Sequence, residues 1–154
     1  TKIGNDSLFM AYAHVAHDCR VGDHVVFANS ATLAGHVEIG DYAILGGFVG
    51  IHQFCKVGAH TMLGVATVTF KDIPPFLMVH CKTAKPYGLN ARGLKRRNFS
   101  EAAIGALKEA YKTVYRSGLT VEQALLELAP LGAQHGEVAV FADFIRNASR
   151  GIIR

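Results

Sequence analysis

Several histidines and one aspartate lie close together in the early part of the sequence, where their side chains could carry out proton transfer. The run His14-Val15-Ala16-His17-Asp18-Cys19 sets two imidazoles beside a carboxylate, and His36 and His52 follow farther along. Imidazole titrates close to neutral pH, so it serves as a general base under physiological conditions. A neighbouring carboxylate can orient such a base. This chemistry requires a fold that brings the side chains together.

A period of six residues indicates that fold. The apolar series is Ile3, Phe9, Val15, Val21, Phe27, Leu33, Ile39, Leu45, Ile51, Val57 and Leu63. A small or β-branched residue comes four positions after each member. No helix or simple strand has this period, whereas a hexapeptide repeat is typical of a parallel β-helix.

The coil of such a β-helix predicts which residues are neighbours. If each hexad forms one side of a triangle, three hexads make a coil of 18 residues. Successive coils stack about 4.8 Å apart, so residues i and i+18 lie next to each other. One predicted column therefore holds His17, Gly35 and Gln53. The next holds Asp18, His36 and Phe54, and His52 lies beside both columns.

This stacked group fits acyl transfer. We interpret His17 as the general base and Asp18 as the group that orients its ring. Gly35 lacks a side chain, so its backbone N–H can approach a developing oxyanion. No outward Ser or Cys adjoins His17, which favours direct attack by a bound hydroxyl or amine over an acyl-enzyme.

Two other interpretations of the histidines are open. A lone surface histidine is more often structural than catalytic, and we interpret His24, His60, His80 and His135 in that way. Histidines on adjacent coils could also bind zinc, as in hexapeptide carbonic anhydrases. Gly35 and the helical second half argue against zinc, so we predict no metal.

Composition narrows the class of protein. The chain has 154 residues, half of them apolar, and a net charge of +4, which fits a globular protein with a mild preference for anionic partners. It contains no aromatic-and-basic nucleic-acid motif, signal peptide or apolar run of membrane-spanning length. Cys19 and Cys55 fall at inward positions of the repeat, so we expect buried, reduced thiols. These features predict a cytoplasmic enzyme.

The organisation changes after Thr69. The paired prolines of Lys71–Pro75 end the strand pattern because proline lacks a donor and fixes the backbone. We predict a mainly β fold in three segments: a β-helix over residues 1–73, an extended connector over 74–89 and a small α-helical domain over 90–154. The helical region opens at 90–97, and a helix is predicted from the N-cap Ser100 to a stop at Gly118. A capping box at Thr120 and Gln123 predicts a second helix to about Leu128, and an amphipathic stretch over 137–149 predicts a last one.

Nothing caps the first coil at Thr1. A β-helix that ended there would expose strand edges and its own core. We therefore expect the chain to be the C-terminal portion of a longer protein, with further coils before it.

Five short stretches, spread over essentially the whole chain, are together specific for one protein family. They are AHVAHDC at 13–19, ATLAGHV at 31–37, IHQFC at 51–55, GLKRR at 93–97 and RGIIR at 150–154. In these stretches the sequence resembles the bacterial UDP-N-acetylglucosamine O-acyltransferases, which perform the first step of lipid A synthesis. The hexapeptide repeat is less specific, since many acyltransferases share it.

The resemblance implies a left-handed β-helix and a homotrimer with active sites between subunits. It implies transfer of an (R)-3-hydroxyacyl group from acyl carrier protein to the 3-hydroxyl of UDP-N-acetylglucosamine. The donor would arrive on the phosphopantetheine of the carrier protein, so no other cofactor is expected.

The resemblance also assigns roles to residues. His17 matches the general base, Asp18 its supporting acid and Gly35 the oxyanion amide. The matched substrate-binding positions are His14, His36, His52, Gln53, Asn90, Arg96 and Arg97. The matched acyl-chain pocket positions are Met62 and Val65. An arginine pair suits a diphosphate or an acidic carrier protein.

Two substitutions depart from the family pattern. Arg92 stands where the family usually has Glu, which reverses a charge near the sugar nucleotide. Val65 follows Gly64 where members that use long chains have a second Gly. A valine would obstruct a long tail, so we predict a donor shorter than fourteen carbons.

Three alternatives to this function stay open. The chain could be a related N-acyltransferase of the same pathway, an acetyl-CoA-dependent acetyltransferase or a β-helix scaffold without activity. GLKRR favours the O-acyltransferase, and the histidine cluster argues against the scaffold.

Overall fold

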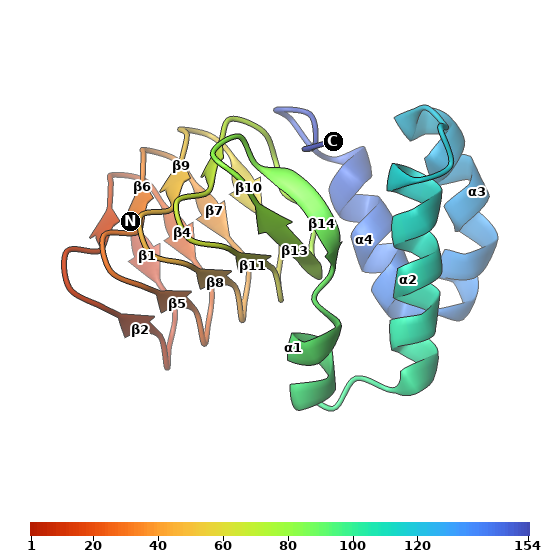
Figure 1. Cartoon of the computed structure of the whole chain (residues 1–154), viewed down its shortest axis with the longest axis horizontal. Coiled ribbons are helices and arrows are strands. Elements are labelled where there is room, and N and C mark those ends of the chain that lie inside the picture. The colour runs from red at the N-terminus through yellow and green to blue at the C-terminus, as the bar shows by residue number, and fades with distance from the viewer.

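The first half of the chain is a parallel β-helix (Figure 1). The computed structural model describes residues 1–154 without a gap. Twelve strands of two residues each begin at every sixth position from Lys2 to Val68. In the first eleven strands the second residue is the apolar member of the repeat, and in β12 the buried Thr69 takes its place. This second residue points inward while the first points outward, because successive side chains of a strand alternate. The predicted hexapeptide β-helix is thereby confirmed.

Strands one coil apart pair in parallel and build three sheets. The first sheet holds β1 (Lys2–Ile3), β4 (Arg20–Val21), β7 (Glu38–Ile39) and β10 (Lys56–Val57). The second holds β2 (Leu8–Phe9), β5 (Val26–Phe27), β8 (Ile44–Leu45) and β11 (Met62–Leu63). The third holds β3 (His14–Val15), β6 (Thr32–Leu33), β9 (Gly50–Ile51) and β12 (Val68–Thr69).

The register confirms the 18-residue coil. His14 lies opposite Thr32, and Val15 lies opposite Leu33. One non-glycine residue at each edge of the prism adopts a left-handed backbone, with φ of 59° at Asp18 and 60° at His36. Few side chains favour that region, although Asp, Asn and His enter it most readily. Each edge also hydrogen-bonds to the next coil, as His36 N does to His17 O at 3.0 Å.

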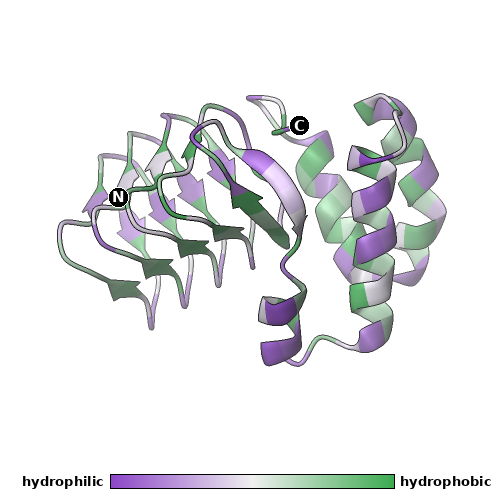
Figure 2. Ribbon diagram, viewed as in Figure 1, coloured by the Kyte–Doolittle hydropathy of each residue, from purple (hydrophilic) through white to green (hydrophobic).

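Apolar side chains fill the prism. Phe27, Leu33, Leu45 and Leu63 are fully buried, and the inward threonines Thr61 and Thr67 satisfy their hydroxyls on the carbonyls of Gly58 and Gly64. Cys19 and Cys55 are buried free thiols, as predicted. Figure 2 shows β5, β8 and β11 as apolar along their whole length, so the second sheet is apolar on its outer face as well as inside.

Residues 74–89, expected as an extended connector, contain two strands. β13 (Leu77–His80) pairs in parallel with β11, and β14 (Lys85–Leu89) pairs antiparallel with β13. The connector therefore lengthens the second sheet and covers the end of the β-helix.

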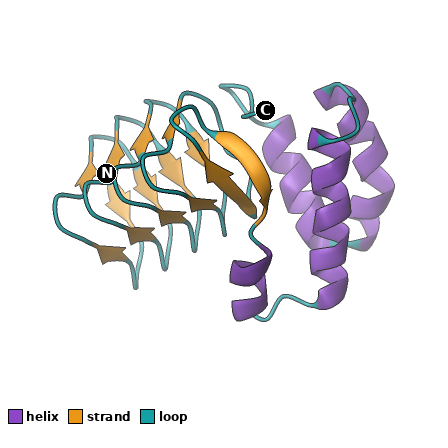
Figure 3. Cartoon of the chain, in the orientation of Figure 1, coloured by secondary structure: helices purple, strands orange, loops and turns teal.

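Four helices make up most of the rest of the chain, as Figure 3 shows. α1 (Ala91–Arg96) and α2 (Glu101–Tyr115) begin at the N-caps Asn90 and Ser100. α3 (Val121–Gln134) has the predicted capping box, but it continues past Pro130 instead of ending near Leu128. α4 (Gly136–Arg146) stops before the predicted end at Ser149.

Helices α2, α3 and α4 pack around Leu107, Leu128 and Phe141, all of which are buried. The longer α3 is explained by Leu131, which packs against this core beyond the predicted end. None of the helices combines the length and apolar character needed to cross a bilayer.

Candidate active site

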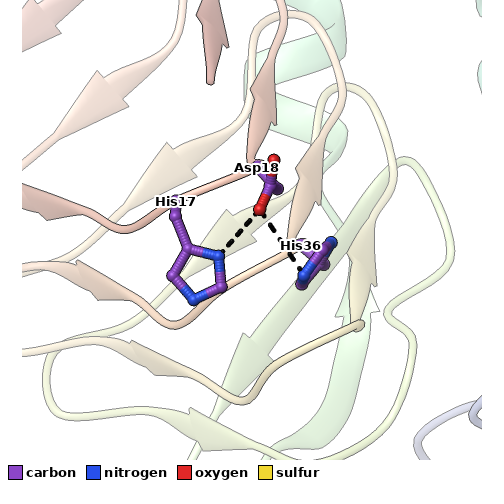
Figure 4. A group of neighbouring side chains, drawn as sticks. All are labelled: His17, Asp18 and His36. Atoms are coloured by element: carbon purple, nitrogen blue, oxygen red, sulfur yellow. Dashed lines mark hydrogen bonds and ion pairs between the residues drawn. The ribbon is translucent and has the colours of Figure 1, made fainter.

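His17 and Asp18 form a hydrogen-bonded pair at the edge between the third and first sheets (Figure 4). The distance from His17 Nδ1 to Asp18 Oδ2 is 2.9 Å, and the two side chains are 72% and 62% exposed. The hydrogen bond from His17 lowers the pKa of Asp18 below its ordinary value, and the nearby imidazole of His36 adds to this effect. Asp18 is therefore an ionised acceptor.

That pairing fixes the tautomer of His17. An ionised carboxylate only accepts hydrogen bonds, so the proton of neutral His17 must lie on Nδ1. Its Nε2 keeps a free lone pair, as a general base requires.

His36 lies on the other side of the same carboxylate. His36 Nε2 is 3.6 Å from Asp18 Oδ2, and the two imidazoles meet edge to face with centroids 5.2 Å apart. The His36 ring also stacks on Phe54 of the next coil at 4.6 Å. Asp18, His36 and Phe54 thus form the predicted column, which holds His36 in place.

Gly35 lies beneath the ring of His17. A Cβ at Gly35 would come within 2.6 Å of His17 Cε1 and 2.7 Å of Nε2, so only glycine leaves room for this ring. The backbone N–H of Gly35 has no acceptor within the chain. The structure therefore places the backbone of Gly35, with its free amide donor, against the ring that carries the free nitrogen of His17.

His52 and its neighbours lie on the same edge but do not touch the His17 pair. His52 Nδ1 is 3.2 Å from the carbonyl of Gln53 and 3.3 Å from Nη2 of Arg150. Gln53 is exposed, and the His14 side chain points outward from β3. Arg150 is a neighbour of this site that sequence reasoning missed. Its only signal was its place in the RGIIR stretch.

Asn90, Arg96 and Arg97 lie at a second edge, between the first and second sheets. The Asn90 side chain is buried and hydrogen-bonded at both its nitrogen and its oxygen: it donates to His60 O at 3.0 Å and accepts from Gly93 N at 3.2 Å. The guanidinium of Arg97 lies 4.1 Å from the centroid of the Tyr42 ring. Arg96 and Arg97 line a hollow of about 480 Å³ with Tyr42.

The expected acyl-chain residues lie elsewhere again. Met62 points outward from β11 in the second sheet and is half-buried. Val65 is 71% exposed at the third edge, between the second and third sheets. The residues around His17, the group of Asn90, Arg96 and Arg97, and the acyl-chain residues therefore lie near three different edges of the prism. One copy of the chain does not bring these three groups together. Arg92 is exposed on α1 and makes no ion pair.

The donor atoms of His17, Asp18 and His36 lie within 4.8 Å of one another and could ligate a cation. A zinc ion needs each ligand atom about 2.0–2.2 Å from a common centre. Here the Asp18 oxygen itself stands between the two imidazoles, at 2.9 Å and 3.6 Å. Asp18 therefore hydrogen-bonds to His17, and its 3.6 Å separation from His36 is an ion-pair distance.

A hollow of about 470 Å³ opens beside this cluster. It is lined by Asp18, His36 and Phe54 and by the charged outer residues Arg20, Glu38 and Lys56. The hollow leaves room for a polar substrate next to the histidines. A stacked β-helix of hexapeptide repeats, with a histidine–carboxylate pair and a free glycine amide at one edge, is the arrangement expected of a hexapeptide transferase.

Comparisons with known proteins identify the family within this class. A family model described as UDP N-acetylglucosamine O-acyltransferase, domain 2, matches residues 72–153, and one described as bacterial transferase hexapeptide matches residues 1–35. The chain belongs to the UDP-N-acetylglucosamine O-acyltransferase family.

Individual relatives agree with the family. The acyl-[acyl-carrier-protein]–UDP-N-acetylglucosamine O-acyltransferase of Thiobacillus denitrificans is 59% identical over the whole chain. The solved UDP-N-acetylglucosamine acyltransferase of Francisella novicida matches with a TM-score of 0.97 at 41% identity, covering 100% of this chain and 56% of that one. LpxA from Acinetobacter baumannii matches at 0.96 and 42%, covering 100% and 60%. The chain spans 60% of the length of the Thiobacillus relative.

Proposed function

We propose that the protein transfers an (R)-3-hydroxyacyl group from acyl carrier protein to the 3-hydroxyl of UDP-N-acetylglucosamine, the first step of lipid A biosynthesis. The observation that carries the proposal is the hydrogen-bonded pair of His17 and Asp18, which leaves Nε2 of His17 free beside the Gly35 amide. Family membership supplies the substrates, since the Thiobacillus relative is named for both.

In the proposed reaction, His17 Nε2 removes the proton of the sugar hydroxyl as its oxygen attacks the thioester carbonyl. Asp18 stabilises the imidazolium that forms. The tetrahedral oxyanion accepts a hydrogen bond from the Gly35 N–H. The intermediate then collapses, the C–S bond breaks and the leaving thiolate takes the proton from His17. The phosphopantetheine of the carrier protein holds the acyl group, and no metal takes part.

Most of the other assigned residues would bind substrate directly. We propose that His14, His36, His52 and Gln53 line the sugar and acyl groups near His17. Arg96 and Arg97 would reach the nucleotide or the donor, with Asn90 holding α1 against His60.

We further propose a homotrimer with active sites between subunits. The assigned groups lie near three edges of one prism, so a neighbouring copy must supply the missing parts of each site. The outer face of the second sheet offers the contact, because its outward residues form an aliphatic stripe. They are Leu8, Val26, Ile44, Met62 and Met78. Such a stripe is unusual on a face left to water.

Finer features of the fold and location complete the proposal. We infer that the β-helix is left-handed, as in the family that the sequence resembles. Residues 90–154 would form a helical domain, with 74–89 as the connection to the β-helix of residues 1–73. The protein would act in the cytoplasm.

The test is acyl transfer by the wild-type protein and His17→Ala with a radiolabelled sugar nucleotide. General-base catalysis contributes about 100-fold or more, so we expect at least that loss in His17→Ala. His135→Ala is the control, because His135 lies between α3 and α4 and its side chain makes no cap hydrogen bond. A His17→Ala variant with wild-type activity would refute the mechanism.

A donor and acceptor panel separates the alternatives. Acyl carrier protein loaded with a hydroxyacyl group should react with UDP-N-acetylglucosamine. Acetyl-CoA as the donor, or a 3-acylated glucosamine as the acceptor, should give no reaction. Reaction only with acetyl-CoA, or only with the acylated amine, would assign the chain to one of the two related acyltransferases.

A further inference from the structure

The C-terminal segment, residues 150–154, returns to the β-helix and is anchored there by Asp72. Asp72 N donates to Gly151 O at 2.8 Å, and Ile153 N donates to Asp72 O at 3.0 Å. The carboxylate of Asp72 is fully buried and accepts from Lys56 N at 2.8 Å and from Arg150 N at 3.2 Å. A buried carboxylate needs such partners, so the segment and β10 are held by one side chain.

The same segment is also fixed to the helices. Ile152 and Ile153 are buried in the core. Arg154 Nη2 donates to the carbonyls of Val114 and Leu119, both at 3.0 Å, at the end of α2. The backbone of Arg150 is therefore held from two sides, although Arg150 itself is exposed.

From this fixed backbone, the side chain of Arg150 reaches the candidate active site. Its Nη2 lies 3.3 Å from His52 Nδ1. The His52 ring packs against Phe70 with centroids 5.2 Å apart. His52 is thus held between an aromatic ring and a guanidinium that comes from the far end of the chain.

The chemistry of arginine selects one tautomer of His52. Arginine stays protonated in proteins and offers only donors. His52 Nδ1 must therefore carry a lone pair to accept this hydrogen bond. A proton on Nδ1 would instead donate to Gln53 O, 3.2 Å away, so the two contacts of Nδ1 exclude each other. A hydrogen bond from a charged guanidinium is about twice as strong as one between neutral groups, so the contact with Arg150 favours Nδ1 as acceptor and the proton of neutral His52 on Nε2.

We propose that Arg150 is a positioning residue that holds His52 as the Nε2–H tautomer, so that His52 donates a hydrogen bond to a substrate oxygen. The role toward substrate rests on the proposed acyl transfer, but the tautomer does not. His52 Nε2 has no partner within the chain and is free to face a ligand. His17 and His52 then take opposite tautomers: Asp18 makes His17 a base, and Arg150 makes His52 a donor.

The tautomer can be read directly by long-range ¹H–¹⁵N NMR of histidine-labelled protein, with His52→Asn to assign the His52 signals. In the wild-type protein we expect a protonated Nε2 and a bare Nδ1. Arg150→Met keeps much of the aliphatic stem but removes every donor, so Nδ1 should gain proton character as it turns to Gln53 O. Arg146→Met, on α4 and paired with Asp143, is the matched control and should change nothing. A protonated Nδ1 in the wild-type protein, or an unchanged tautomer in Arg150→Met, would overturn the inference.

Kinetics tests the catalytic meaning of the tautomer. Losing a well-placed donor should lower kcat/KM about tenfold in Arg150→Met, with the unfolding temperature near that of Arg146→Met. A shifted tautomer with unchanged kcat/KM would refute the positioning role. If the wild-type protein shows the expected tautomers but no acyl transfer, the proposed function fails and the assignment of the His52 tautomer stands.

Discussion

His17 lies directly over Gly35, and its ring occupies the space where any other residue would carry a Cβ. That Cβ would stand 2.6 Å from Cε1 and 2.7 Å from Nε2 of His17. The glycine is needed for this contact and not for its backbone conformation, since Gly35 is absent from the positive-φ residues. The contact links the proposed base to the proposed oxyanion donor.

We predict that Gly35→Ala lowers activity without lowering stability much. The His17 side chain is 72% exposed, so its ring can swing away from the new methyl group at little cost. The displaced Nε2 should reduce kcat by about 100-fold, the scale of general-base catalysis. Gly47→Ala is the matched control, because Gly47 has the same place in its hexad and its Cβ would meet nothing nearer than 3.5 Å. Equal activities of the two variants would contradict this prediction.

The contact between His17 and Gly35 was predictable from sequence because a solenoid turns a fixed spacing into a contact. The same rule placed Asp18 beside His36, and the structure has them 3.6 Å apart. The contact of Arg150 with His52 was not predictable, since 98 residues separate them and no period relates them. It depends on how the helices fold back and on the buried anchor at Asp72. The burial of Asn90 against His60 likewise depends on tertiary packing that no local pattern encodes.

Metal removal should leave acyl transfer unchanged. Asp18 Oδ2 already accepts the hydrogen bond of His17 Nδ1 at 2.9 Å, and the proposed reaction uses these side chains for proton transfer without a cation. We therefore expect full activity after treatment with EDTA or phenanthroline, and no stoichiometric zinc by mass spectrometry of the purified protein. Activity that is lost on chelation and restored by added zinc would show that the zinc interpretation is correct.

Replacing Val65 should change the preferred length of the acyl donor. The Val65 side chain projects from the third edge near Gly47. In the proposed trimer a β-branched group there would obstruct the end of the acyl chain. A hydrophobic pocket discriminates about tenfold or more per methylene. We expect the wild-type protein to prefer donors of ten or twelve carbons, and Val65→Gly to favour fourteen by about tenfold, with Val65→Ala in between. A wild-type preference for the fourteen-carbon donor would contradict this assignment.

His60 lies in a column of rings that is buried where α1 meets the β-helix. Its ring stacks on Tyr42 at 5.0 Å and on Phe76 at 5.8 Å, and Phe99 meets it edge to face. His60 Nδ1 is buried and has no hydrogen-bond partner. Burial lowers the pKa of His60 below its ordinary value of 6.5; the charge of Arg97 adds to this effect and Asp41 opposes it.

His60→Phe should therefore stabilise the protein, and more so in mild acid. A phenyl ring keeps the stacking and removes the unpaired nitrogen, which should add about 1 kcal/mol to the free energy of unfolding at neutral pH. Below pH 6.5 the unfolded chain binds a proton at His60 that the folded protein resists, so wild-type stability falls as pH drops from 6.5 toward the lowered folded pKa. The His60→Phe variant has no group that titrates at this position, so it does not lose stability in this way. The difference in unfolding temperature should thus widen between about pH 7.5 and pH 5.5. A constant difference across this range would mean that His60 does not resist protonation in the fold.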